Sequence, residues 1–228
     1  YQESLVLLQN ALEETKTKHR KGDTHDMLGR VTTALGDFDA AKEHYHQALQ
    51  LKERDLGKKH RDIATTLNNI ADLNYILGQT ENVESLYRRA LQINKRDQLN
   101  LEVCRSLNGL ALLHNDNGEF TEAEEHLKRA ITIHTKAERR DHPYLATVLT
   151  NLGILYTNLE RYKEAAPLFE RAEYIQNHEL RSDHPDVAVR LHATAALLHA
   201  TGKTTQSAKL AARAENIRSK QQAKADLY

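Results

Sequence analysis

The sequence contains few of the residues that interrupt helices. Among its 228 residues it has 3 prolines, 9 glycines and no tryptophan. Glycine and proline are the residues least favourable inside a helix, whereas Ala, Leu, Glu, Lys, Arg and Gln lose little side-chain freedom there. The composition therefore favours an all-α protein.

Other absences argue against several classes of function. The 32 basic and 32 acidic residues give a formal net charge of zero, which is unlike a chain that neutralises a nucleic-acid backbone or lies on an anionic membrane. No apolar run approaches the roughly 20 residues that span a bilayer, and no signal-peptide pattern opens the chain. We therefore expect no nucleic-acid partner and no membrane insertion.

The sequence has a single cysteine, Cys104, which cannot form a disulfide within the chain. This fits a reducing compartment, and we expect a cytoplasmic protein. The first residue is Tyr1 and not Met, so we also expect a piece cut from a longer chain, with other domains of that chain among its partners.

A short motif occurs three times at nearly fixed intervals. It reads HRDIA from His60, HPYLA from His142 and HPDVA from His184. Two further markers advance in steps of 42, 40, 42 and 42 residues, and this agreement indicates an internal repeat. These markers are Ala48, Ala90, Ala130, Ala172 and Ala214, and Gly36, Gly78, Gly118 and Gly202, with Glu160 where a further glycine is due.

The repeated histidine has an interpretation that needs no substrate. Proline suits the first turn of a helix, where its missing N–H has no intrahelical partner in any case. Asp186 would lie in that turn, near the positive end of the helix dipole. We therefore expect the motif to mark the start of a repeat.

Each repeat is predicted to contain two helices. In residues 62–77 the apolar positions Ile63, Leu67, Ile70 and Ala71 follow the spacing of an amphipathic helix. Gly78 is expected to end that helix, because glycine accepts the left-handed backbone of a C-terminal cap. A second helix is predicted over residues 80–94.

The second helices carry a family resemblance. Their stretches EHYHQALQL, SLYRRALQI, EHLKRAITI and PLFERAEYI resemble the tetratricopeptide repeat. The 42-residue spacing is similar to that of kinesin light chains and nephrocystin-3-like proteins, and to sensor regions of signal-transducing ATPases. The resemblance implies a right-handed α-α superhelix of about eleven antiparallel helices.

The repeat markers divide the chain into one continuous solenoid of five helix pairs, preceded by a single helix. The last pair has small residues where earlier units have large ones, which suits either a terminal cap or a surface for another domain. The predicted ranges are 1–20 for the second helix of an upstream repeat, 22–56, 60–98, 100–138 and 142–180 for repeats one to four, and 184–228 for repeat five and the cap.

The sequence offers little support for catalysis or a bound cofactor. Its 13 histidines are not accompanied by the paired ligands that zinc sites need. No glycine-rich phosphate loop and no nucleophile elbow is present. Cys104 occupies a position that holds alanine in other repeats, so we expect it to be a small buried packing residue. We predict a protein that is not an enzyme and that has no cofactor and no metal.

In the family that the sequence resembles, the first helix of each pair lines a concave groove. Residues of these helices that lie off the packing stripe are the candidates for binding a peptide, and Asn amides suit a peptide backbone because they both donate and accept. The candidates are Arg30, Asn68, Asn69, Asp72, Tyr75, Arg105, Asn108, Leu112, Asn115, Thr147, Thr150, Asn151, Asn158, His192 and His199. The alternative is that these residues form solvated helix faces.

Three functions are compatible with this pattern. The first is a non-catalytic scaffold or adaptor that binds a peptide or a partner domain in the groove, as kinesin light chains do. The second is a sensing or autoinhibitory region of a larger signalling protein, an ATPase of the signal-transducing type or a receptor. The third is a structural spacer without a preferred ligand.

Overall fold

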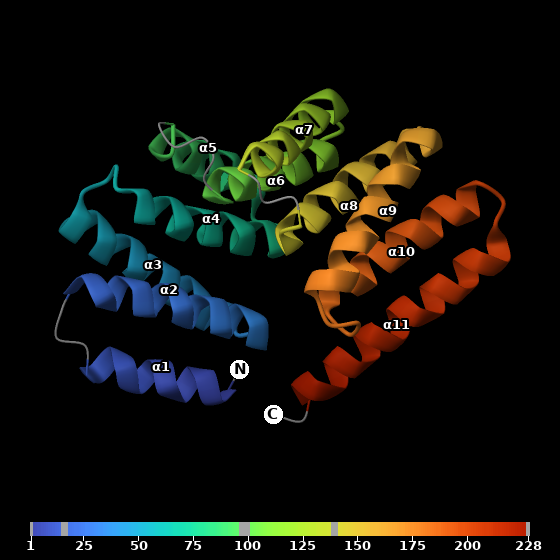
Figure 1. The fold of residues 1–228 in the computed structure, drawn as a ribbon. Helices are drawn as coiled ribbons and strands as arrows, with labels where there is room; N and C mark the ends of the chain where they lie inside the picture. Colours follow the sequence, from blue (N-terminus) through green and yellow to red (C-terminus); the bar gives the residue numbers. More distant parts are fainter. Residues whose placement is uncertain (1, 15–17, 96–100, 138–140, 227–228) are drawn as a thin grey trace. The chain divides into compact units, whose positions relative to one another are not determined.

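The computed structural model describes residues 2–14, 18–95, 101–137 and 141–226. Within these residues it has eleven α-helices, one short 3-10 helix and no strand, which confirms the all-α prediction (Figure 1). Packing divides the chain into two compact units, Tyr1–Leu113 and His114–Tyr228. Each unit is described by itself.

The first unit consists of antiparallel helices that pack in chain order. Tyr45 lies in a cluster with Ala41 and Leu73, and Tyr87 lies in a cluster with Ala71 and Leu110. The helices pair α2 with α3 and α4 with α5 (Figure 1). The elements are α1 (Gln2–Glu14), α2 (Lys18–Leu35), α3 (Phe38–Leu56), α4 (Arg61–Ile76), η1 (Thr80–Asn82), α5 (Val83–Ile93) and most of α6 (Leu101–Asp116).

The second unit repeats this arrangement. Ala172 and Ile175 pack with Leu149, and Ala214 and Ile217 pack with Leu191. Helix α8 pairs with α9, and α10 pairs with α11 (Figure 1). The elements are α7 (Phe120–Lys136), α8 (Pro143–Asn158), α9 (Tyr162–Glu179), α10 (Pro185–Ala200) and α11 (Thr204–Asp226).

The predicted boundary between residues 20 and 22 is wrong. Helix α1 ends at Glu14 and α2 already begins at Lys18, so Gly22 lies inside a helix. A Cβ atom at Gly22 would lie 2.9 Å from Cγ of Lys52. The glycine therefore allows the stem of Lys52 to approach α2 closely, and it does not separate two helices.

The repeated glycine ends the first helix of a pair, as predicted. Gly78 has a φ of 69°, and the next residue, Gln79, donates its backbone N–H to the carbonyl of Asn74 at 2.8 Å. This hydrogen bond satisfies a carbonyl that the end of the helix leaves unpaired. Glu160 takes the same backbone conformation with a φ of 61°, although it is not a glycine. The amide of Arg161 donates to Tyr156 at 2.8 Å in the same way.

The repeated histidine caps the N-terminus of the next first helix. The Nδ1 atoms of His60, His142 and His184 accept hydrogen bonds from backbone amides two residues later, at 3.3, 3.1 and 3.2 Å. All three histidines have extended backbone angles, as an N-cap requires. The histidine is therefore a structural residue that starts a helix.

Glu160→Gly is expected to stabilise the protein. A side chain in the left-handed region costs about 1–2 kcal/mol. Glycine removes this cost, but its greater freedom in the unfolded chain offsets part of the gain in stability. We expect the free energy of unfolding, measured by urea denaturation, to rise by about 1 kcal/mol. Gly78→Ala should lower it by a similar amount, and a destabilised Glu160→Gly variant would contradict this account.

Loss of a histidine cap should cost stability. We expect His184→Ala to lower the free energy of unfolding by about 1 kcal/mol, because an amide of the first turn loses its acceptor. His184→Asn, which keeps an acceptor at this position, should recover most of that loss. Equal losses in the two variants would show that the cap does not account for the histidine.

Candidate functional site

The predicted groove residues lie on the first helices α2, α4, α6, α8 and α10, but they differ in exposure. Asn68, Asn69, Asn108 and Thr150 are buried, and Arg30, Asn158, His192 and His199 are exposed. The half-buried residues are Asp72, Tyr75, Arg105, Leu112, Asn115, Thr147 and Asn151.

One of these positions packs against the next first helix in the first unit. The amide nitrogen of Asn68, on α4, donates to a carboxylate oxygen of Glu102 at 2.8 Å, and its carbonyl oxygen accepts from Ser106 at 2.7 Å. Both partners lie on α6. Asn108, Thr150 and His192 occupy the same place in later repeats. His192 is exposed because α10 is the last first helix in the described part of the chain.

A buried carboxylate, Asp26 on α2, connects three helices of the first unit. It pairs with Lys52 of α3 and accepts a hydrogen bond from Thr66 of α4 at 2.7 Å. Asn69, also on α4, donates to its other oxygen at 3.5 Å. Burial alone would lower the pKa of Lys52, but the charges and hydrogen bonds of Asp26 and Asp23 together outweigh burial and raise it. Lys52 therefore stays charged and holds Asp26 in place.

Arg105 extends this polar chain to α6. Its guanidinium donates to the carbonyl oxygen of Asn69 at 2.9 Å and to the carboxylate of Asp72 at 2.7 Å. The hydroxyl of Tyr87 donates to the other oxygen of Asp72 at 2.6 Å. The structure thus brings three predicted site residues, Asn69, Asp72 and Arg105, together. Their contacts join neighbouring helices of the first unit.

The most open part of the predicted surface in the second unit lies on α8 and α10. Asn158, His192 and His199 are exposed, and Asn151 is half-buried. Thr150 instead donates to the carbonyl of Ala146 at 2.8 Å within its own helix. The exposed side chains provide donors and acceptors at helical spacings.

A second charged cluster holds α7 to α8 and to the loop that follows α8. Glu124 accepts hydrogen bonds from Arg161 at 2.6 Å and from Tyr156 at 2.8 Å, and it pairs with Lys128 at 2.5 Å. Burial raises the pKa of the Glu124 carboxyl, but these three hydrogen bonds outweigh burial and lower it to about 2. The guanidinium of Arg161 also lies 4.0 Å from the centre of the Tyr156 ring.

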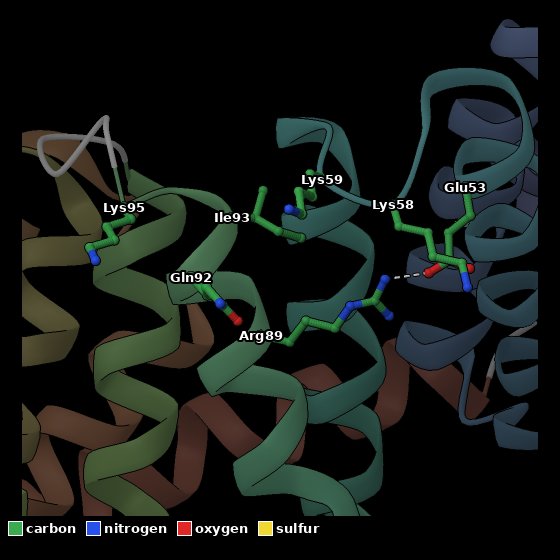
Figure 2. Close-up of a pocket in the computed structure, with 7 residues that line it drawn as sticks. All are labelled: Glu53, Lys58, Lys59, Arg89, Gln92, Ile93 and Lys95. Atoms are coloured by element: carbon green, nitrogen blue, oxygen red, sulfur yellow. Dashed lines mark hydrogen bonds and ion pairs between the residues drawn. The ribbon is translucent and has the colours of Figure 1, made fainter.

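The structure also has a charged hollow that the sequence prediction missed. It lies in the first unit, between the end of α3, the loop that follows it and the end of α5, and has a volume of about 820 Å³ (Figure 2). The lining residues are Glu53, Lys58, Lys59, Arg89, Gln92, Ile93 and Lys95. We call this site the basic hollow.

None of the predicted groove residues lines the basic hollow. The signal that could have indicated it is the pair Lys58–Lys59 in the linker LGKKHRD.

The described residues can also be checked for metal ligands, for membrane-crossing helices and for the burial of Cys104. No group of three or more His, Cys, Asp or Glu side chains in this part of the chain could hold a metal ion. Within the same residues, no helix combines the length and apolar character needed to cross a membrane. Cys104 is fully buried, as a packing residue would be.

Helix pairs that recur every 40 to 42 residues define an α-helical repeat protein. Residues 20–96 and 102–177 match the family model of the tetratricopeptide repeat, and these ranges cover more than half of the chain. The chain belongs to the tetratricopeptide repeat family.

Solved structures with the same fold include kinesin light chain-like proteins. BtubC (BKLC) from P. vanneervenii is 21% identical, with a TM-score of 0.75 over 96% of this chain and 91% of that one. A putative kinesin light chain with TPR-like repeats from Podosopora anserina is 23% identical, with a TM-score of 0.64 over 91% and 99%.

A Rap protein complexed with competence and sporulation factor is 13% identical, with a TM-score of 0.71 over 97% of this chain and 72% of that one. At such identities these likenesses establish the fold alone. No curated protein matches the sequence.

The Glu124 cluster predicts how stability depends on pH. Because the folded-state pKa lies below the ordinary value of 4.5, the carboxylate stabilises the folded state fully above that pH, and this contribution is lost as the pH falls toward 2. We expect Glu124→Gln to lower the free energy of unfolding by about 1 kcal/mol at pH 5 and by less at pH 3.

Urea denaturation at pH 5, 4 and 3 would measure this difference. Glu125→Gln is the matched control, because Glu125 is the exposed neighbour on the same helix. A deficit of Glu124→Gln that stays constant with pH would contradict the assigned role of the carboxylate.

Proposed function

We propose that this chain is a protein-interaction scaffold without catalysis of its own, and that the exposed face of its first helices binds a peptide or a partner domain. The tetratricopeptide repeats support a role in protein interaction. We also propose that this binding uses the first-helix face, in the manner of kinesin light chain-like arrays.

The observation that carries this proposal is how the polar residues of the first helices are divided. Asn68 and Asn69 are buried and hydrogen-bonded to neighbouring helices. Asn158, His192 and His199 lie on first helices of the second unit with exposed side chains. The first group supports the array, and the second leaves donors and acceptors available to a ligand.

We further propose a cytoplasmic location and protein partners that include other domains of a longer parent chain. The chain has a single cysteine, which cannot form a disulfide within the chain, and this fits a reducing compartment. We propose neither a nucleic-acid partner nor insertion into a membrane, because the chain has no net positive charge to attract phosphates or anionic lipids.

A sensing or autoinhibitory role is the second candidate. It is supported by the likeness to the Rap protein complexed with competence and sporulation factor, over 97% of this chain. In that case the first-helix face would bind a signalling ligand, and this binding would change the activity of an attached domain. A scaffold would bind its partner without such an effect.

The groove proposal can be tested with exposed residues alone. We would identify co-purifying proteins by mass spectrometry and measure capture of the strongest one by the purified chain. The variant Asn158→Ala, His192→Ala and His199→Ala should reduce this capture several-fold while circular dichroism remains unchanged. Only side chains that project into solvent are truncated, so the core stays intact.

Asn68→Ala provides the matched control. It leaves buried polar groups on α6 without their partner and should lower the free energy of unfolding by about 1–3 kcal/mol. Capture by the folded fraction of this variant should stay the same. Unchanged capture by a folded triple variant would refute binding at the first-helix face.

A further inference from the structure

The basic hollow carries an excess of positive charge. Four of its seven lining residues are basic, and Glu53 is the single acidic one. Glu53 is already paired with Arg89. Figure 2 shows this pair between the α3–α4 linker and α5, with Lys58 and Lys59 on the linker side. The hollow thus has positive charge that its own carboxylate cannot balance.

Lys58 and Lys59 lie at the centre of a tight turn. The backbone amide of His60 donates to the carbonyl of Gly57 at 3.0 Å, which closes the turn around the two lysines. Both lysines are exposed, and neither has a hydrogen bond or ion pair within the described residues. A short turn next to a capped helix therefore presents two adjacent ammonium groups.

Two later linkers carry a carboxylate that pairs with an arginine of the chain. The position of Lys59 is taken by Asp141 and Asp183 in the later linkers. In the second unit, Arg171, the equivalent of Arg89, donates to Asp141 at 2.7 Å. A self-neutralising pair is therefore possible at this place, and the linker after α3 has a lysine instead.

The turn that contains Asp183 has the same backbone hydrogen bond. The amide of His184 donates to the carbonyl of Arg181 at 3.0 Å, with Ser182 and Asp183 at its centre. The fold accepts either Lys-Lys or Ser-Asp in this turn. The lysines are thus not needed for the turn, and their charge is free to serve recognition.

The form of the hollow indicates which anion it would bind. It is about 820 Å³ in volume and takes its cations from the linker and from α5 and its end. The C-terminal ends of α3 and α5 lie here, and a helix C-terminus lacks the free backbone amides that hold phosphate at a helix N-terminus. Ile93 and Gln92 add an apolar and an amide contact. Dispersed carboxylates on a peptide match these features better than one concentrated charge.

We propose that the basic hollow is a second docking site, which binds an acidic segment of a partner protein that carries two or more neighbouring Asp or Glu side chains. Lys58 and Lys59 attract the carboxylates, Gln92 hydrogen-bonds the peptide, and Ile93 contacts an apolar side chain of the segment. This site lies on other residues than the first-helix face and does not depend on binding there.

The test uses the full 228-residue chain and a fluorescein-labelled octapeptide with six Asp or Glu residues around a central leucine. Fluorescence anisotropy should show saturable binding that weakens as salt is raised from 0.15 M to 0.5 M, since salt screens the charges. A peptide with Asn and Gln in place of the acids should not bind. Absence of saturable binding by the acidic peptide would overturn the proposal.

The variant Lys58→Ser with Lys59→Asp copies the Ser182–Asp183 turn, so the fold should accept it. We expect it to weaken peptide binding by about tenfold, because one attraction is lost and another becomes a repulsion. The control, Lys163→Ser with Lys209→Asp, makes the same change of charge at two exposed lysines of the second unit. It should bind the peptide as the parent does.

Peptide binding by these two double variants can contradict the proposal in more than one way. Equal weakening in both variants would show attraction to net charge and no site, and unchanged binding in the Lys58 and Lys59 variant would place the peptide elsewhere. Tighter binding of a single-stranded oligonucleotide than of the acidic peptide would also overturn the proposal. The triple variant of Asn158, His192 and His199 should leave this binding unchanged, which separates the two sites.

Discussion

Close contact between a small residue on a first helix and a large ring on a second helix is the constraint on which the array depends. A Cβ atom at Gly29 would lie 2.5 Å from the ring of Tyr45, and one at Gly153 would lie 2.7 Å from the ring of Phe169. Real Cβ atoms do not approach this closely, so the α2–α3 and α8–α9 pairs reach this separation only with glycine there. Ala71 takes the equivalent place on α4, where it packs with Tyr87. Dense packing of these rings excludes water from each pair.

The stacked pairs need polar as well as apolar contacts. An isolated pair cannot bury its apolar face, and stacking neighbours complete the core. In the first unit, buried Asp26 pairs with Lys52 within the α2–α3 pair and accepts a hydrogen bond from Thr66 of the next pair. Replacing one member alone would leave a buried charge without its partner, which is costly. This explains why polar residues on a first helix can be structural.

The candidate site was therefore only partly predictable from the sequence. Periodicity correctly placed Asn68 and His192 on first helices, at equivalent positions. It could not show that Asn68 is buried against α6 while His192 is exposed. That difference arises from which helix packs next to each of them. The basic hollow was missed for a similar reason, because Lys58 and Arg89 are 31 positions apart in the sequence.

The sequence by itself determined the helical class, the repeat length and the left-handed turn at Gly78, because these follow from local backbone preferences and a fixed period. The same period marked Glu160 as the place where a glycine is due, but local preference opposes the left-handed backbone that Glu160 has there. It also placed the histidine motif at the start of the helices. Only the tertiary structure decided that Asn69 and Arg105 bond across helices and that positive charge gathers beside Arg89. These outcomes depend on distances between residues that are remote in the chain, and side-chain periodicity along one helix does not contain those distances.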